Sequence, residues 1–360
     1  MSSISCGIVG LPNVGKSTLF NALTKSSVLA ANYPFATIDP NVGIVSVPDP
    51  RLQRLSELYS SQKITPATVR FVDIAGLVAG ASKGEGLGNQ FLAHIRSTSS
   101  IVEVVRVFSD NLITHVNKKV DPRTDIDTIL TELALADLDT VNRRLGQTEK
   151  EAKANPKLRP KLELLKEASK FLEQGKPVSS GLDNDSLEGL SDLQLLTAKP
   201  IIYLFNVDED VLEDQQKQKE LKSLVAPSEA LFISVKLESE LSTLEDYDAK
   251  ELRESYNIHL SGLESLVVAA YKALGLQSFL TAGQKEVRAW TIRKGATAPE
   301  AAGEIHSDMQ RGFIAAEIVN YKDLDELGSV SACRAAGKIR TEGKSYIMQP
   351  DDIVEFKFNV

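Results

Sequence analysis

The sequence has 360 residues, of which 42% are hydrophobic and 25% are charged. This composition is typical of globular proteins and excludes a disordered, collagenous or disulfide-stapled chain. At about 150 residues per domain, the length predicts two or three domains. No apolar run reaches the ~18 residues of a membrane span, and the first residues lack the basic segment of a signal peptide. Two distant cysteines fit a reducing compartment, so we expect a cytoplasmic protein.

The net charge of −8 argues, taken whole, against a nucleic-acid-binding protein. The charges are unevenly distributed, however. Residues 200–276 carry seven basic and 15 acidic side chains, whereas residues 1–108 carry nine basic and six acidic ones. Residues 143–170 carry nine basic and four acidic side chains. An RNA-rich partner is therefore still compatible with the sequence, provided that it avoids the acidic segment.

Short apolar runs separated by helical patterns predict a parallel sheet covered on both faces, which makes the first part of the chain an α/β domain. The runs are residues 4–9, 69–74, 101–108, 201–205 and 231–235. A helix over residues 17–24 is predicted to follow the first run directly.

A helical insertion is predicted between the third and fourth runs, over residues 120–198. Leucine, isoleucine and valine recur three or four residues apart over 126–145 and again over 158–172. Asn155-Pro156 breaks the first series and Gly175 caps the second, so we expect an α-helical hairpin with coiled-coil-like packing. A solvated helical arm without chemistry is the alternative.

Residues 277–360 are predicted to form a separate small α+β unit. Short alternating runs lie at 286–291, 312–319 and 353–358, and helices fit 299–306 and 330–336. Residues 1–276 then form the first domain, which carries the insertion.

Residues 10–17, GLPNVGKS, match the phosphate-loop motif G-x-x-x-x-G-K-[ST] in full, between a predicted strand and a predicted helix. Glycines allow backbone N–H groups to point at phosphate oxygens. Lys16 is expected to reach the β- and γ-phosphates, and the Ser17 hydroxyl to bind Mg²⁺. The residues expected to hold the nucleotide here are Asn13, Val14, Gly15, Lys16, Ser17 and Thr18.

A second motif, Asp73-Ile74-Ala75-Gly76, ends the second run. Asp73 can hold Mg²⁺ through water, and the Gly76 N–H can meet the γ-phosphate. Thr37 lies in a loop before this run, where its hydroxyl would bind Mg²⁺ only while a γ-phosphate keeps the loop closed. An ordinary loop threonine is the alternative for Thr37.

At this point the chain resembles the TRAFAC class of P-loop GTPases, and more closely the YchF subfamily of the Obg family. The stretches that carry the resemblance span essentially the whole chain and include GIVGLPNVGKSTLFNALT (7–24), FVDIAGLVAGASKGEGLGNQFL (71–92), GATAPEAAGEIH (295–306) and the terminal FKFNV. The resemblance implies an OBG-type, Ras-like G domain with a coiled-coil insertion, and a C-terminal TGS domain with a β-grasp fold.

Guanine-specific members carry N-K-x-D after the next strand, but this chain has Asn206-Val207-Asp208-Glu209 there. The loss of the lysine and the longer carboxylate weaken guanine recognition, and the resemblance implies ATP over GTP. Asn206 and Val207 would then contact adenine, partly through the backbone, and Ser234 and Val235 would flank the base. GTP as the substrate remains the alternative.

The catalytic group is expected to differ from that of Ras-like enzymes. Leu77 stands where Ras-like enzymes have a water-orienting glutamine. Asn13 resembles the asparagine that binds K⁺ in some related enzymes, so K⁺ is a further expected cofactor. His115 follows the third run and could align water, which makes Lys16, Gly76 and His115 the expected catalytic residues; a surface-loop histidine is the alternative. The glycine-rich loop 80–88 is expected to act as a switch.

The sequence is compatible with two functions. In the first, the chain is a slow, monomeric ATP hydrolase and switch; the resemblance implies the 70S ribosome and the large ribosomal subunit as partners. Basic side chains of the arm would meet rRNA phosphates; they are Arg143, Arg144, Lys150, Lys153, Lys157, Arg159 and Lys161.

In the second function, the chain is a GTP-dependent module in which hydrolysis is secondary. Arg288, Trp290 and Arg293 of the C-terminal unit would then bind RNA, either rRNA or tRNA, or a protein loop. Packing of Trp290 in the small core is the alternative reading of that residue. A metabolic P-loop kinase is disfavoured because D-x-x-G and the Thr37 loop are parts of a switch.

Overall fold

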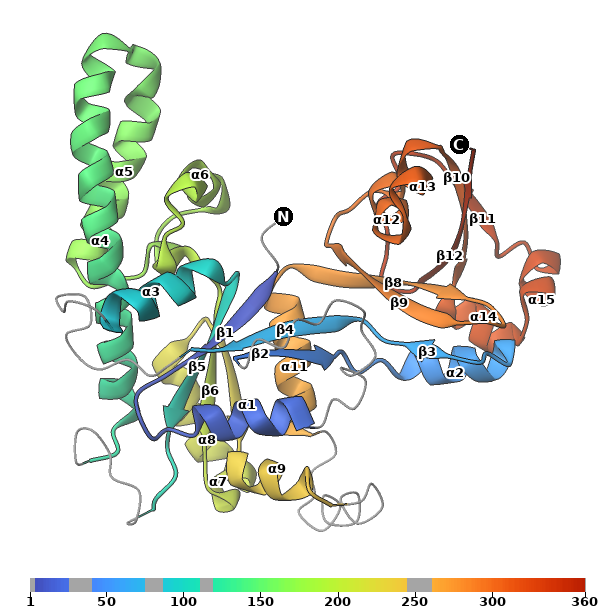
Figure 1. Cartoon of the computed structure of the whole chain (residues 1–360), viewed down its shortest axis with the longest axis horizontal. Coiled ribbons are helices and arrows are strands. Elements are labelled where there is room, and N and C mark those ends of the chain that lie inside the picture. Colours follow the sequence, from blue (N-terminus) through green and yellow to red (C-terminus); the bar gives the residue numbers. More distant parts are fainter. Residues whose placement is uncertain (1–3, 26–40, 75–86, 111–118, 245–260, 360) are drawn as a thin grey trace. The chain divides into compact units, whose positions relative to one another are not determined.

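The computed structural model describes residues 4–25, 41–74, 87–110, 119–244 and 261–359 (Figure 1). The chain forms two compact units: residues 1–44 with 70–270, and residues 45–69 with 271–360. Each unit has its own six-stranded sheet.

The sheet of the first unit has the strand order β2-β4-β1-β5-β6-β7. Its strands are β1 (Ser5–Val9), β2 (Val42–Ser46), β4 (Thr68–Asp73), β5 (Ser100–Arg106), β6 (Ile201–Asn206) and β7 (Glu229–Ile233). Strand β1 pairs in parallel with β4 on one side and β5 on the other, and the parallel pairing continues through β6 to β7. The five predicted strands are therefore confirmed, and the carboxyl end of β1 lies where an open parallel sheet binds its ligands.

The helices of the first unit include the predicted one directly after β1. Within the described residues, the α-helices of this unit are α1 (Lys16–Lys25), α3 (Leu87–Ser97), α4 (Pro122–Ala154), α5 (Arg159–Glu173), α6 (Asn184–Gly189), α7 (Glu209–Glu213), α8 (Gln215–Val225), α9 (Val235–Leu241) and α11 (Gly262–Ala273). Over the described part of the chain, no helix has both the length and the apolar character that crossing a membrane requires.

Helices α4 and α5 lie side by side in the inserted segment (Figure 1). Helix α4 begins after Asp121, whose side chain accepts a hydrogen bond from the Thr124 N–H. It ends before Asn155, where the sequence predicts the break. Gly175, with φ +70°, follows α5. The predicted seam packs around buried Val141 and Leu165. The coiled-coil geometry of this pair remains a prediction.

The sheet of the second unit has the order β11-β10-β12-β8-β9-β3. Its strands are β3 (Ile64–Thr65), β8 (Leu276–Ala282), β9 (Val287–Arg293), β10 (Phe313–Asn320), β11 (Arg340–Glu342) and β12 (Asp352–Phe358). Its helices are α2 (Pro50–Tyr59), α12 (Ala298–Ile305), α13 (Ser307–Arg311), α14 (Tyr321–Leu327) and α15 (Val330–Ala335). Three alanines of α12 pack with Phe279, Phe313 and Phe356 in one core. A β-grasp fold for this unit remains a prediction.

The unit to which residues 45–69 belong differs from the sequence-based prediction, which assigned them to the first domain. In the structure they group with residues 271–360. Strand β3 pairs in parallel with β9, and Arg51 of α2 bridges Asp49 at 2.7 Å and Asp351 at 2.8 Å. The β3–β9 pairing and the Arg51–Asp351 bridge join residues 223 and 300 positions apart, so no local pattern in the sequence predicts them.

Asp137 of α4 binds the last residues of the insertion through hydrogen bonds, and its substitution tests how much these bonds stabilise the fold. Its buried carboxylate accepts from the N–H groups of Leu196 and Thr197 at 2.9 and 2.8 Å, and from the Thr197 hydroxyl at 2.7 Å. We expect Asp137→Ala to lower the free energy of unfolding by about 3 kcal/mol, because buried donors lose their acceptor. Urea unfolding measures this. Asp139→Ala, at an exposed carboxylate on the same helix, is the control and should cost under about 0.5 kcal/mol; equal losses would contradict the role of Asp137.

Glu103 of β5 predicts a pH dependence of stability. The side chain is 1% exposed, and neither carboxyl oxygen has a hydrogen-bond partner within the described residues. Burial raises the pKa of Glu103 well above its usual range, and the negative charges of Asp125 and Asp127 raise it further; Tyr203 also faces this carboxyl. The group is then neutral when folded and ionised when unfolded, so stability falls as the pH rises above the ordinary glutamate range.

We therefore expect Glu103→Gln to gain more stability over the wild type at pH 8 than at pH 5. Urea unfolding at the two pH values measures the difference, with Glu149→Gln, at an exposed position of α4, as the control. The same gain at both pH values would show that Glu103 does not ionise differently in the two states.

Candidate phosphate-binding site

The loop between β1 and α1 has the backbone geometry that its motif predicts. Asn13 has φ +63° and Gly15 has φ +101°. A Cβ atom at Gly15 would lie 2.5 Å from Nδ2 of Asn206, so a side chain fits neither the conformation nor the space. The loop therefore curls tightly before Lys16, in the way that phosphate-binding loops do.

Lys16 is 8% exposed, and its Nζ donates to the Leu11 carbonyl at 2.7 Å across the loop. Burial lowers the pKa of Lys16 to about 8, and the negative charge of Asp73 offsets part of this shift. The site thus holds an ammonium group that is poorly solvated, and a phosphate bound beside it would stabilise the charged form.

Asp73 and Ser17 lie together at the carboxyl end of the sheet. Strand β4 pairs with β1 so that Asp73 is opposite Ile8, and the Ser17 hydroxyl donates to Asp73 Oδ2 at 3.2 Å. The other oxygen, Oδ1, is buried and has no hydrogen-bond partner among the described residues. A hydroxyl next to a carboxylate with an unused oxygen is a donor set that suits Mg²⁺.

Several expected site residues lie outside the described residues. These are Thr37, Gly76, Leu77 and His115, together with most of the loop 80–88. Their roles remain predictions.

Asn206 joins the phosphate loop to the segment after β7. Its Nδ2 donates to the Val14 carbonyl at 2.9 Å, and its Oδ1 accepts from the Val235 N–H at 3.1 Å. The side chain is 5% exposed. The structure thus brings Asn206, Val14 and Val235 together, with the carboxamide of Asn206 acting as a brace between two loops.

The other expected base-contacting residues have different surroundings. Val207 is 2% exposed and packs in a hydrophobic cluster with Phe205 and Leu221, and its N–H donates to the Ile233 carbonyl at 3.0 Å. Its side chain is therefore not available to a base. The Ser234 hydroxyl donates to Glu209 Oε1 at 3.3 Å. The carboxylate at the position of the guanine-reading aspartate is therefore already engaged by the neighbouring loop.

Arg106 is a buried residue of this region that the sequence analysis did not single out. It is the last residue of β5 and lies opposite Asn206 in the β5–β6 pair. The signal was an arginine inside the apolar run IVEVVRVF, where a charge is unexpected unless it has partners.

Some of the basic residues of the inserted arm form ion pairs with acidic side chains. Lys161 pairs with Asp192, and Arg143 lies 3.6 Å from Asp139. Four exposed side chains at the junction of α4 and α5 form no ion pair with any other described residue; they are Lys150, Lys153, Lys157 and Arg159, and we call them the basic tip.

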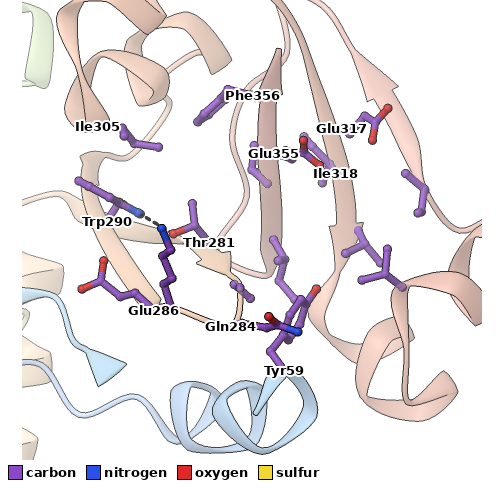
Figure 2. A pocket seen from close by; sticks show the side chains of 18 of the residues that line it. Tyr59, Thr281, Gln284, Glu286, Trp290, Ile305, Glu317, Ile318, Glu355 and Phe356 are labelled. Carbon is purple, nitrogen blue, oxygen red and sulfur yellow. Dashed lines mark hydrogen bonds between the residues drawn. The ribbon is translucent and has the colours of Figure 1, made fainter. Parts of the chain in front are cut away.

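The second unit contains a cavity of about 700 Å³ (Figure 2). Trp290 and Ile305 line one side of it, with Ile318 and Glu355 on the opposite side. The Trp290 Nε1–H donates to Thr281 Oγ1 at 2.9 Å, and the Arg288 guanidinium lies 3.8 Å from the ring centroid. The indole also packs against the core of this unit, in agreement with the structural alternative for Trp290.

Comparisons with known proteins agree with the architecture of both units. Residues 5–138 match a family described as 50S ribosome-binding GTPase, and residues 276–359 match the YchF-GTPase C-terminal family, described as a protein of unknown function. The chain is 48% identical to "Ribosome-binding ATPase YchF" of Haemophilus influenzae over 99% of both chains. It is 49% identical to the protein of the same name from Bacillus subtilis, over 99% of this chain and 100% of the relative.

A solved structure extends the similarity to three dimensions. The YchF GTPase of Schizosaccharomyces pombe matches with a TM-score of 0.87 and 41% identity, over 98% of this chain and 97% of that one. Identity at this level over nearly the full length of several relatives leaves one assignment: the chain belongs to the YchF family.

Proposed function

We propose that the chain is an Mg²⁺-dependent ATPase that acts as a nucleotide-dependent switch and binds the ribosome. The observation that carries the enzymatic part is the arrangement of Lys16, Ser17 and Asp73 at the carboxyl end of β1. The printed name shared by the relatives, "Ribosome-binding ATPase YchF", supports both the activity and the partner. A ribosomal partner agrees with a cytoplasmic location, which we also propose.

The described residues can each take a defined part in ATP hydrolysis. Lys16 would neutralise charge that develops on the β- and γ-phosphates. Ser17 and Asp73 would hold Mg²⁺, which supplies further charge neutralisation when bound. Backbone N–H groups of residues 13–18 would orient the phosphates. We further propose that Thr37 and Gly76 close on the γ-phosphate, and that His115 orients the attacking water.

ATP is the proposed substrate because the guanine-reading apparatus is incomplete. Val207 replaces the lysine that would cover the base, and its side chain is buried. Glu209 is one methylene longer than the guanine-reading aspartate, and its Oε1 accepts a hydrogen bond from Ser234, which orients the carboxylate toward the neighbouring loop. An unpaired polar group in a binding site costs affinity, so guanine should bind less well than adenine.

Substitution of Lys16 tests the enzymatic proposal. With Mg²⁺ present, we expect the wild type to hydrolyse ATP with multiple turnovers and to bind ATP at least about tenfold more tightly than GTP by calorimetry. Lys16→Ala should lower the hydrolysis rate by about 100-fold or more. Lys25→Ala, at an exposed position of the same helix, is the matched control and should retain the wild-type rate. Tighter binding of GTP would favour the alternative, GTP-dependent module.

The same hydrolysis assay separates the finer proposals. Faster turnover in K⁺ than in Na⁺ buffer is expected if Asn13 holds a potassium ion near the phosphates, and equal rates would remove that cofactor. His115→Ala should slow turnover without weakening ATP binding; an unchanged rate would assign the histidine to an ordinary surface loop.

For the ribosome, we propose the basic tip as one contact, which would meet rRNA phosphates. Its four side chains are exposed and unpaired among the described residues, and they lie at the junction of α4 and α5. Binding to phosphates through such groups weakens as salt rises. The chain is proposed to act as a monomer, with the second unit as a TGS domain.

Charge reversal at the basic tip tests this contact. We expect Lys150→Glu with Lys153→Glu to weaken cosedimentation with 70S ribosomes and large subunits by at least about tenfold, because several phosphate contacts become repulsive. ATP hydrolysis in the absence of ribosomes should stay at the wild-type rate. Lys166→Glu with Lys170→Glu, on α5 outside the basic tip, is the control with the same charge change. Unchanged cosedimentation would exclude the basic tip from the interface.

A further inference from the structure

Arg106 is a fully buried cation next to the nucleotide site, and the proposed hydrolysis leaves it without a role. It ends β5 directly beside Asn206 of β6, and it is 2% exposed. A guanidinium in such a place must be matched by hydrogen-bond acceptors, because burying an uncompensated charge is costly. Its acceptors therefore indicate what it holds in place.

Two of these acceptors are carbonyls of the segment that follows β5. Arg106 Nε donates to the Phe108 carbonyl at 3.3 Å, and Nη2 donates to the Asp110 carbonyl at 3.1 Å. The guanidinium carbon also lies 4.3 Å from the centroid of the Phe108 ring. The backbone of residues 107–110 is thus folded back around a single side chain.

The N–H groups of that same segment point to the end of β6. Val107 and Phe108 both donate to the Asn206 carbonyl, at 2.9 and 3.1 Å. The Ser109 N–H donates to Asp208 Oδ2 at 2.9 Å. Each hydrogen bond fixes a residue of the Asn206–Glu209 motif relative to β5.

We propose that Arg106 is a positioning residue for nucleotide binding, acting through Asn206. By holding the carbonyls of Phe108 and Asp110, it keeps three N–H groups on Asn206 and Asp208. Asn206 in turn keeps its carboxamide on Val14 of the phosphate loop and on Val235. Arg106 itself contacts no substrate, and this role rests on the proposed nucleotide-binding function.

Arginine suits this position for a geometric reason. Its planar guanidinium presents donors in a fixed fork, which can serve two carbonyls in different directions and stack on a ring at the same time. A lysine keeps the charge but offers one compact ammonium group on a flexible chain. Arg106→Lys therefore separates the arrangement of the donors from the charge.

The experiment measures the dissociation constants of ATP and ADP with Mg²⁺ for wild type and Arg106→Lys. We expect both constants to rise by the same factor, about five- to tenfold, because about 1 kcal/mol of hydrogen bonding that shapes the loop is lost. The kcat at saturating ATP should change less than about twofold, since Lys16, Ser17 and Asp73 are not on this route. Arg96→Lys is the matched control: its half-buried guanidinium bonds Thr140 at 3.1 Å, and its substitution should leave both constants unchanged.

A double-mutant cycle tests the route through Asn206. In an Asn206→Ala background, Arg106→Lys should add less than about twofold to either dissociation constant, because the brace it supports is already gone. Asp208→Ala is a milder variant at a partly exposed residue, and it should raise the ATP and ADP constants equally by about two- to fivefold. It serves as the test if Arg106→Lys does not fold.

The outcomes distinguish this role from the function on which it rests. A wild type that binds neither ATP nor ADP overturns the proposed function, and this role with it. A wild type that binds both, with unchanged constants in folded Arg106→Lys or in Asp208→Ala, overturns the role of Arg106 alone. Weaker binding of ATP but not of ADP, or additive effects in the cycle, also overturns it, because Arg106 would then act on the γ-phosphate or independently of Asn206.

Discussion

The carboxamide of Asn206 is the interaction on which the geometry of the site depends. Its two ends bond Val14 and Val235, and so connect the loops that follow β1 and β7 across the end of β6. The close approach leaves 2.5 Å between Nδ2 and the place where a Cβ of Gly15 would be. The glycine of the phosphate motif is thus required by a side chain nearly 200 residues away as well as by the curvature of its own loop.

Electrostatics then decide what this rigid frame can hold. A buried lysine lies at the same edge of the sheet as a carboxylate that has one oxygen without a hydrogen-bond partner among the described residues. Burial leaves both charged groups poorly solvated, so each would be stabilised by a ligand of opposite charge. Phosphate oxygens would match the lysine and a divalent cation would match the carboxylate, so the proposed ligand, Mg²⁺-nucleotide, would complement both groups together.

Helix α4 connects this site region to the arm because it contributes to two hydrophobic cores. Ile126, near its start, packs with Val105 and Phe205 of the sheet. Val141, further along, packs with Leu165 of α5. A continuous helix of 33 residues therefore links the sheet that carries the phosphate loop to the basic tip. Acidic residues concentrate in a different segment of the sequence, residues 200–276.

Local sequence determined the parts of this protein that depend on neighbouring residues. The apolar runs predicted β1, β4, β5, β6 and β7, and the phosphate motif predicted the loop and α1, because burial pattern and glycine conformation are encoded within a few positions. The Ser17 hydroxyl lies next to Asp73, because parallel strands bring their carboxyl ends to one edge of the sheet; Mg²⁺ binding by these two residues stays a proposal.

Tertiary structure alone decided the rest. Residues 45–69 joined the second unit through a two-residue strand and an arginine bridge, which no local period marks. The side chain of Val207 turned into a core rather than toward a base, and Arg106 found its acceptors in the backbone that follows it. These outcomes depend on which groups meet when distant segments pack, and a buried charge or carboxamide reveals its role only once its partners are in place.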